Sequence, residues 1–192
     1  MKKLLLFLSI SSLLFGCNKS KVEQVAADSS AMEDQRPWHT WEDCGQLPGD
    51  NPCNFSFKNQ HGEDVELYDN YGKIIVVDLS AMWCGVCQRI ANEGDALVSQ
   101  YGSENIVWLT LLVEDESGLQ PDQSDLKRWV DMYLISTDVL AADRSIVDST
   151  GKDGYPVSGW PTVVIINKEM KVYNGVTGWS KDLVTSWIEE LN

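Results

Sequence analysis

Two cysteines three residues apart, Cys84 and Cys87, have the types and the spacing for redox chemistry. They follow a continuously apolar segment (74–77) and precede a segment with helical periodicity. The first thiol is therefore expected at a helix N-terminus, where unpaired amides and the helix dipole favour the thiolate. The second thiol lies one turn further on, within reach of a disulfide with the first. This arrangement predicts an attacking thiolate at Cys84 and a resolving thiol at Cys87.

A second pair, Cys44 and Cys53, brackets a loop that contains Pro48 and Pro52. Closing a loop of about ten residues would stabilise the fold by about 2.7 kcal/mol on the chain-entropy estimate. We interpret the pair as a structural disulfide. A second redox pair that exchanges electrons with Cys84–Cys87 is the alternative. A four-cysteine zinc site is disfavoured by the spacing of the ligands, and no metal is predicted.

The N-terminal segment predicts export. Residues 1–16 combine two lysines with a short apolar run, which is typical of a signal peptide. A helix of about twelve residues spans about 18 Å, too short for a bilayer core of about 30 Å. The end of the segment, Gly16-Cys17, resembles the bacterial lipobox, which implies cleavage after Gly16 and a lipid on Cys17; an ordinary secretory signal is the alternative. Residues 17–36 are polar and aperiodic, which predicts a flexible tether.

The elements that must position the redox pair follow from the apolar patterns. Strands continuously rich in Val, Ile and Leu indicate burial on both faces, whereas apolar positions repeated every three to four residues indicate helices. We expect a hairpin over 54–67, strands over 74–77, 106–113, 139–142, 160–166 and 171–173, and helices over 88–101, from Asp122 or Ser124 to 133, and over 180–191.

Two segments carry a family resemblance. Residues 77–87, with the sequence VDLSAMWCGVC, resemble the active-site segment of thioredoxins, and 159–162, GWPT, resemble their cis-proline loop. The hairpin and an insertion over 114–138 resemble the membrane-tethered, extracytoplasmic reductases of the TlpA and ResA type. The resemblance implies an α/β, thioredoxin-like fold over residues 37–192. This fold is a central mixed sheet flanked by helices, here with an N-terminal β-hairpin extension and a central insertion.

The resemblance also implies a catalytic acid. Asp78 matches the buried acid that thioredoxins place beneath the resolving cysteine, so it would accept the proton of Cys87. A hydrogen-bonded aspartate at a strand end is the alternative. Two positions depart from the thioredoxin pattern: Val86 replaces a proline and Ser80 replaces an aromatic residue. The dipeptide between the cysteines tunes thiolate stability, so the direction of electron flow stays open.

Substrate-binding residues are implied around the cis-proline loop. Pro161 would be cis and would face the redox pair, and the backbone of Trp160 would hydrogen-bond to a substrate segment. Thr162 belongs to the same loop. Trp83 and Trp160 adjoin the two motifs and would form an apolar rim for docking partners. Of the other tryptophans, Trp108, Trp129 and Trp187 are expected in the core.

The charge of the chain limits its partners. The 192 residues carry 29 Asp+Glu against 15 Lys+Arg, a formal net charge of −14. Such an acidic protein repels phosphate backbones, so no nucleic-acid partner is predicted. No histidine follows His61, which removes the ligand that a copper chaperone of this superfamily would need. No cofactor is predicted.

The resemblance therefore implies a membrane-anchored, extracytoplasmic thiol–disulfide oxidoreductase, a bacterial lipoprotein of the cell envelope. Its partners would be protein thiols and disulfides and a membrane electron-transfer protein, and its lipid anchor would hold it at the membrane, facing the periplasm or the extracytoplasmic side. Asn18 is not the aspartate that retains lipoproteins at the inner membrane of enteric bacteria, which favours the outer membrane.

Two alternatives stay open. A non-catalytic envelope binding module would share the fold and keep Cys84–Cys87 as a permanent disulfide. A thiol peroxidase is disfavoured, because peroxiredoxins need a Ser or Thr three residues before the reactive cysteine, where this chain has Ala81.

Overall fold

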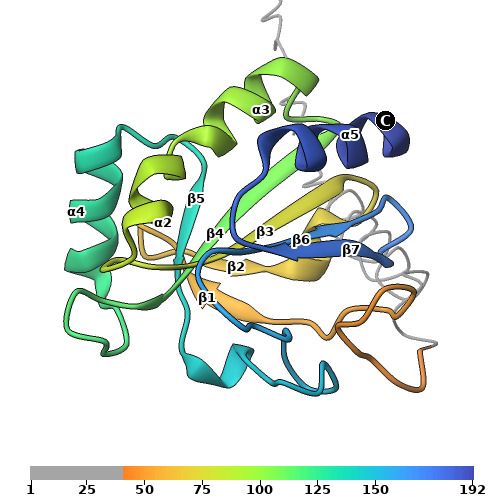
Figure 1. The fold of residues 1–192 in the computed structure, drawn as a ribbon, viewed down its shortest axis with the longest axis horizontal. Coiled ribbons are helices and arrows are strands. Elements are labelled where there is room, and N and C mark those ends of the chain that lie inside the picture. The colour runs from red at the N-terminus through yellow and green to blue at the C-terminus, as the bar shows by residue number, and fades with distance from the viewer. Residues whose placement is uncertain (1–40) are drawn as a thin grey trace, which may run out of the picture. The chain divides into compact units, whose positions relative to one another are not determined.

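A five-stranded mixed sheet forms the centre of the fold (Figure 1). The computed structural model describes residues 41–192, of which Glu42–Asn192 form one unit; the predicted signal peptide, Cys17 and the tether to residue 36 lie outside the described residues. The strand order is β5-β4-β3-β6-β7. The strands are β3 (Ile74–Ala81), β4 (Ile106–Glu114), β5 (Asp138–Ala141), β6 (Thr162–Ile166) and β7 (Val172–Thr177).

The centre of the sheet consists of β3 and β4, which pair in parallel. Every residue of β3 is buried, as its run of β-branched and apolar side chains predicts. β4 also pairs in parallel with β5, whereas β3 with β6 and β6 with β7 are antiparallel. This is the predicted mixed sheet, and β3 leads directly into the redox turn.

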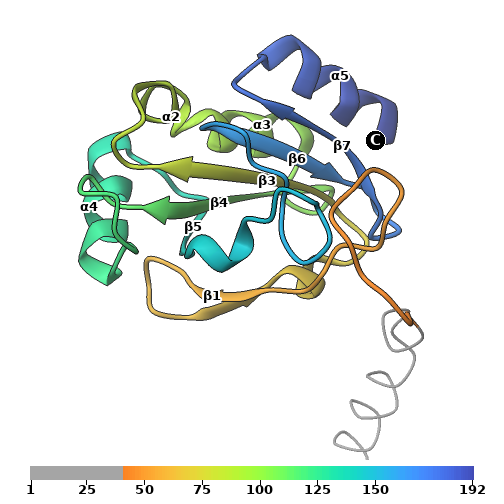
Figure 2. The same ribbon diagram turned by 60° about the horizontal axis from the view of Figure 1, so that its bottom comes forward.

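Helices α2 (Gly85–Ile90), α3 (Glu93–Tyr101) and α5 (Lys181–Leu191) cover one face of this sheet (Figures 1 and 2). The predicted core tryptophans Trp108 and Trp187 are buried on that side with Leu97 of α3 and Ile188 of α5. Ser180 lies at the N-cap position of α5, but its side chain makes no capping hydrogen bond. None of the helices within residues 41–192 is long and apolar enough to cross a bilayer.

The single helix predicted over 88–101 is wrong in two respects. The helix begins earlier, at Gly85, because Cys84 takes the N-cap position. It is also interrupted, since Asn92 has φ −105° and ψ 9°, outside the helical range, and α3 starts afresh at Glu93. The new direction brings Gly94 against the Trp108 ring, where a Cβ atom would lie 2.4 Å from the indole.

The predicted hairpin is present on the other side of the sheet (Figure 2). It consists of β1 (Ser56–Lys58) and β2 (Asp64–Glu66), and the 3-10 turn Leu67–Asn70 follows β2 in the chain. Its turn carries two buried polar residues, Asn59 and Gln60. Asn59 bridges to Leu140 of β5, and the Gln60 side chain accepts from the Val139 amide and donates to the Thr137 carbonyl. The hairpin therefore covers the free edge of β5, which would otherwise expose unpaired backbone groups.

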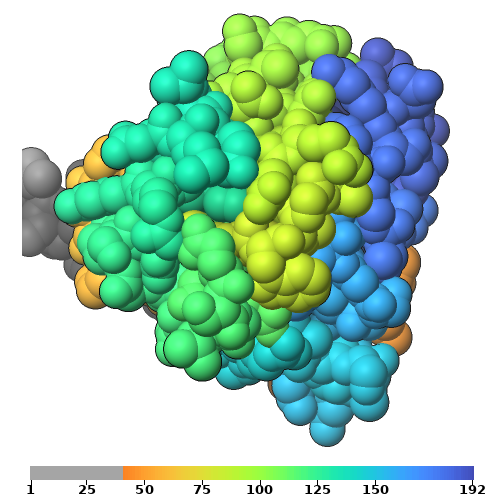
Figure 3. Space-filling model, turned by 60° about the vertical axis from the view of Figure 1, so that its left-hand side comes forward, coloured from red at the N-terminus to blue at the C-terminus, as the bar shows by residue number. Residues whose placement is uncertain are grey.

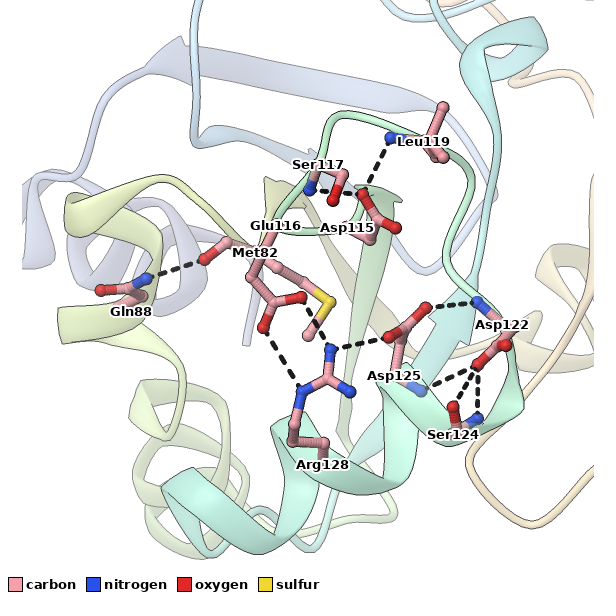
Figure 4. A network of polar contacts seen from close by, with 10 residues as sticks. All are labelled: Met82, Gln88, Asp115, Glu116, Ser117, Leu119, Asp122, Ser124, Asp125 and Arg128. Atoms are coloured by element: carbon pink, nitrogen blue, oxygen red, sulfur yellow. Dashed lines mark hydrogen bonds and ion pairs between the residues drawn. The ribbon is translucent and has the colours of Figure 1, made fainter.

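The insertion between β4 and β5 is a polar loop followed by α4 (Gln123–Tyr133). Of the two predicted caps, Asp122 is the one used, because its carboxylate accepts from the amides of Ser124 and Asp125. Arg128 of α4 reaches back to the loop and pairs with Glu116 and Asp125, each at 2.7 Å (Figure 4). The loop is thus fixed to its own helix.

The loop closed by the Cys44–Cys53 disulfide forms the N-terminal end of the described chain. Its backbone pairs with the start of β7. The Gly49 amide donates to the Val172 carbonyl, and the Val172 amide donates to the Asp50 carbonyl. The Gln46 amide donates to the Gly151 carbonyl at 2.7 Å. The loop therefore joins the start of β7 to the connection between β5 and β6, which contains the 3-10 turn Arg144–Ile146.

Candidate functional site

The redox pair lies at the start of α2, directly after β3. Cys84 and Cys87 form a disulfide with their Cα atoms 5.2 Å apart. The Sγ atom of Cys84 accepts a hydrogen bond from the Cys87 amide at 3.2 Å. Cys84 is 7% exposed and Cys87 is 0% exposed. Of the two cysteines, only Cys84 has any exposed surface, and its sulfur also faces a backbone donor able to stabilise a thiolate.

The redox turn is fixed by three hydrogen bonds. The Cys84 amide donates to the Ala81 carbonyl at 3.0 Å, and the Met82 amide donates to the Glu114 carbonyl at 2.9 Å. Gln88 of α2 donates from its side chain to the Met82 carbonyl at 2.8 Å (Figure 4). These bonds hold the turn in addition to the disulfide.

The insertion packs against the redox pair. Both cysteines belong to a buried cluster to which α4 contributes Leu126 and Trp129 and β4 contributes Leu112. In the space-filling view, residues 80–92 (yellow-green) reach the surface between the insertion (green to teal) and the segment before β6 (light blue) (Figure 3). A partner that approaches Cys84 would meet these three segments.

Asp78 lies on β3 and is 1% exposed. Ser80 donates to its Oδ1 at 2.7 Å and Thr110 of β4 donates to its Oδ2 at 3.4 Å. Burial raises the pKa of Asp78 from 3.8 to about 6, and the two hydroxyl donors oppose that rise. Asp78 is therefore a buried, hydrogen-bonded acid whose pKa lies well above that of a free carboxyl.

The cis-proline loop is present. The Trp160–Pro161 peptide bond is cis, as the resemblance implies, and the Pro161 carbonyl accepts from the Gly178 amide at 2.7 Å. Half-buried Trp160 packs against the cluster that contains the redox pair. Thr162 is 4% exposed, and its hydroxyl donates to the Gly159 carbonyl at 2.8 Å. Its side chain therefore shapes the loop and is almost entirely covered.

Glu114 is a residue of this region that the sequence reasoning did not single out. It ends β4 and is 3% exposed. Its carboxylate accepts from the Trp83 indole at 2.8 Å and pairs with Arg144, from the connection that leads to the cis-proline loop. Trp83 itself is 50% exposed, beside Cys84. The only signal in the sequence is that a charged residue ends a long apolar strand.

The Cys44–Cys53 disulfide belongs to a different part of the chain. Cys44 is exposed, and the Cys53 sulfur lies 3.6 Å from the Lys152 carbonyl. Neither cysteine belongs to the cluster around the redox pair. Within residues 41–192, no three His, Cys, Asp or Glu side chains are grouped so that they could bind a metal ion.

Comparison with known proteins identifies the family. A family model described as the AhpC/TSA family matches residues 48–174. The chain belongs to the AhpC/TSA family. Among its relatives, the thiol-disulfide oxidoreductase ResA of Halalkalibacterium halodurans is 23% identical over 144 residues, which cover 73% of this chain and 75% of that protein. ResA of Bacillus subtilis is 27% identical over 134 residues, which cover 68% and 67%.

Solved structures share the fold. The exposed lipoprotein thioredoxin Etrx1 of Streptococcus pneumoniae superposes with a TM-score of 0.58 at 25% identity, over 72% of this chain and 100% of that one. With the family and the two ResA relatives, this match confirms the predicted thioredoxin-like fold and the enzyme class, thiol–disulfide oxidoreductase. The peroxidase alternative is not favoured, and Ala81 stands where a peroxidase would need a hydroxyl.

Proposed function

We propose that the protein exchanges disulfides with cysteines of other proteins through the Cys84–Cys87 pair, in the cell envelope, and that a lipid on Cys17 holds it at the membrane. The observation that carries this proposal is the asymmetry of the pair. Cys84 combines access from outside with a backbone donor to its sulfur, whereas Cys87 is fully buried behind it. A permanent structural disulfide in a binding module would need neither property.

The exchange transfers two electrons in two steps. In the direction of reduction, the Cys84 thiolate attacks a sulfur of the substrate disulfide, a mixed disulfide forms, and the other substrate sulfur leaves as a thiolate. The Cys87 thiolate then attacks the Cys84 sulfur, which closes the Cys84–Cys87 disulfide and releases the second substrate thiolate. A dithiol of a membrane electron-transfer partner returns the pair to the reduced state. The same steps in reverse oxidise a substrate dithiol.

Asp78 serves as the base for the second step. Cys87 is buried, so its proton cannot pass directly to bulk water. A carboxylate with a pKa of about 6 is mostly ionised at pH 7 and can take that proton while the mixed disulfide resolves. It returns the proton when the pair is reduced again.

Docking involves the surface around Cys84. The exposed ring of Trp83 and the half-buried ring of Trp160 offer apolar area, and Trp160 offers backbone groups next to Pro161. Thr162 contributes by holding the loop through its bond to Gly159. A partner cysteine flanked by an extended segment would fit such a surface, since extended chains bind through main-chain hydrogen bonds.

The envelope location is supported by the lipobox-like sequence before Cys17 and by two disulfides in the described chain. The structural relative Etrx1 is described as an exposed lipoprotein. Asn18 favours the outer membrane over the inner in our proposal. A Cys17→Ser variant is expected to leave the membrane fraction, and retention there would contradict the anchor.

Trapping tests the function most simply. Cys87→Ala removes the resolving thiol, so Cys84 should accumulate mixed disulfides with envelope proteins that are visible on non-reducing gels and lost with reductant. The matched control, Cys84→Ala with Cys87 retained, should trap far less, because its thiol is buried. Equal trapping by the two variants would contradict the assigned roles of Cys84 and Cys87. No trapping by either variant would favour the alternative, a non-catalytic binding module.

A further inference from the structure

Ser80 stands where the thioredoxin pattern has an aromatic side chain, and the function proposed above gives it no role. It belongs to β3 and is 1% exposed. Two residues apart on one strand, Ser80 and Asp78 point to the same face of the sheet. The Ser80 hydroxyl uses this placement to donate to Asp78 Oδ1 at 2.7 Å. The departure from the family pattern therefore introduces a hydrogen-bond donor for the buried acid.

The other oxygen of the acid has a donor whose direction is fixed. The Trp108 indole donates to the Thr110 hydroxyl at 3.0 Å. Because an indole can only donate, the Thr110 oxygen accepts there, and its single proton is left to point at Asp78 Oδ2, 3.4 Å away. The hydroxyl protons of Ser80 and Thr110 therefore both point toward the Asp78 carboxylate. Ser80 is the nearer of the two and makes the stronger bond.

No charged side chain takes part in this arrangement. The causes that shift the pKa of Asp78 are burial, Ser80 and Thr110. On the covering helices, Glu93 of α3 pairs with Lys181 of α5 at 2.7 Å. Asp95 of α3 accepts from the amides of residues 136 and 137. The sheet neighbour of Asp78 on the β6 side is Val163, which carries no titratable group.

We propose that Ser80 is a positioning residue that keeps the Asp78 carboxylate ionised and oriented, so that this carboxylate can take the proton of Cys87 when the mixed disulfide resolves. The inference rests on the proposed function. The proton passes from Cys87 Sγ to Asp78, the thiolate attacks Cys84 Sγ, and the sulfur bound there leaves with the electron pair. A carboxylate in an apolar interior without such a donor would stay protonated to higher pH, so less of it could act as a base at acidic pH.

The test follows the resolving step alone. Full-length reduced protein reacts with Ellman's reagent at Cys84 in a first, bimolecular phase. In a second, concentration-independent phase Cys87 displaces the remaining nitrothiobenzoate, whose absorbance gives the rate. This rate is measured from pH 5 to pH 8 for wild type, Ser80→Ala, Ser80→Thr, Thr110→Val and Asp78→Asn, and for Ser80→Ala combined with Asp78→Asn. Circular dichroism checks that each variant is folded.

Loss of a hydrogen bond to a charged group should raise the inflection of the Ser80→Ala profile by about one pH unit. With the wild-type inflection near pH 6, that shift makes the resolving step about ninefold slower at pH 5 and leaves it nearly unchanged at pH 8. Ser80→Thr keeps the hydroxyl and should restore the profile. Thr110→Val removes the longer bond at similar volume and should shift the inflection by less.

The double variant separates the outcomes. If Ser80 acts through Asp78, Ser80→Ala has no effect on the profile once Asp78 is Asn. A shift that persists in the double variant, or a Ser80→Ala profile identical to wild type while Asp78→Asn loses the inflection, would overturn the role of Ser80 and leave the function intact. If Asp78→Asn keeps the inflection, Asp78 is not the base. If no second phase occurs in wild type, the proposed function itself is wrong.

Discussion

Replacing Asp78 with Asn should stabilise the folded protein, and only at neutral and alkaline pH. Burial raises the folded-state pKa of this acid from 3.8 to about 6. As pH rises, the unfolded chain therefore loses its proton near pH 4, while the folded chain keeps it until about pH 6. Ionisation thus favours the unfolded state, and wild-type stability falls across this window. At pH values above the folded-state pKa, this pKa shift lowers the free energy of unfolding by about 3 kcal/mol.

Asparagine resembles the protonated acid in size and does not titrate, so the variant escapes this loss. The difference in the free energy of unfolding between Asp78→Asn and wild type should widen by about 2 to 3 kcal/mol from pH 4 to pH 8. Urea unfolding of the oxidised protein, followed by tryptophan fluorescence at both pH values, measures it. Asp131→Asn, the same change at an exposed position of α4, should leave the difference within about 0.5 kcal/mol. A constant difference for Asp78→Asn would refute the buried-acid reasoning.

Three further changes test the packing. Glu114→Ala removes the acceptor of the half-exposed Trp83 indole and should cost about 1 kcal/mol in urea unfolding, whereas Glu114→Gln, which keeps an oxygen, should cost less. Replacing Cys44 and Cys53 together with Ser should lower stability by about 2.7 kcal/mol and leave the exchange rate unchanged; a lost exchange rate would give this pair a redox role. Gly94→Ala, which presses a methyl group onto a β4 indole, should cost about 1–3 kcal/mol by thermal unfolding, and a neutral result would contradict the close packing.

The sequence predicted those elements whose signals are local. β3 and β4 are mostly apolar and almost entirely buried, and α4 has both an amphipathic pattern and a capping aspartate in Asp122. The break between α2 and α3 has no local signal. Beyond the break, Gly94 of α3 packs closely against Trp108 of β4, a contact that no local pattern shows. Periodicity alone therefore predicts one helix where the structure has two, α2 and α3.

The redox pair was predictable for the same reason, because Cys84, Cys87 and Asp78 belong to one short segment with a strand on one side and a helix on the other. Glu114 was not, because its partners Trp83 and Arg144 lie about thirty residues away on either side. A charged residue at a strand end is ordinary. Only the fold shows that Glu114 is buried and contacts both Trp83 and Arg144.

A redox titration shows whether Cys84–Cys87 is a reversible redox couple. The full-length protein is equilibrated in thiol buffers of known potential, free thiols are alkylated, and the modified cysteines are identified by mass. We predict that Cys84 and Cys87 change together as one two-electron couple between about −270 and about −120 mV, while Cys44–Cys53 stays oxidised down to about −300 mV. A Cys84–Cys87 pair that does not titrate in this range would contradict its role in disulfide exchange.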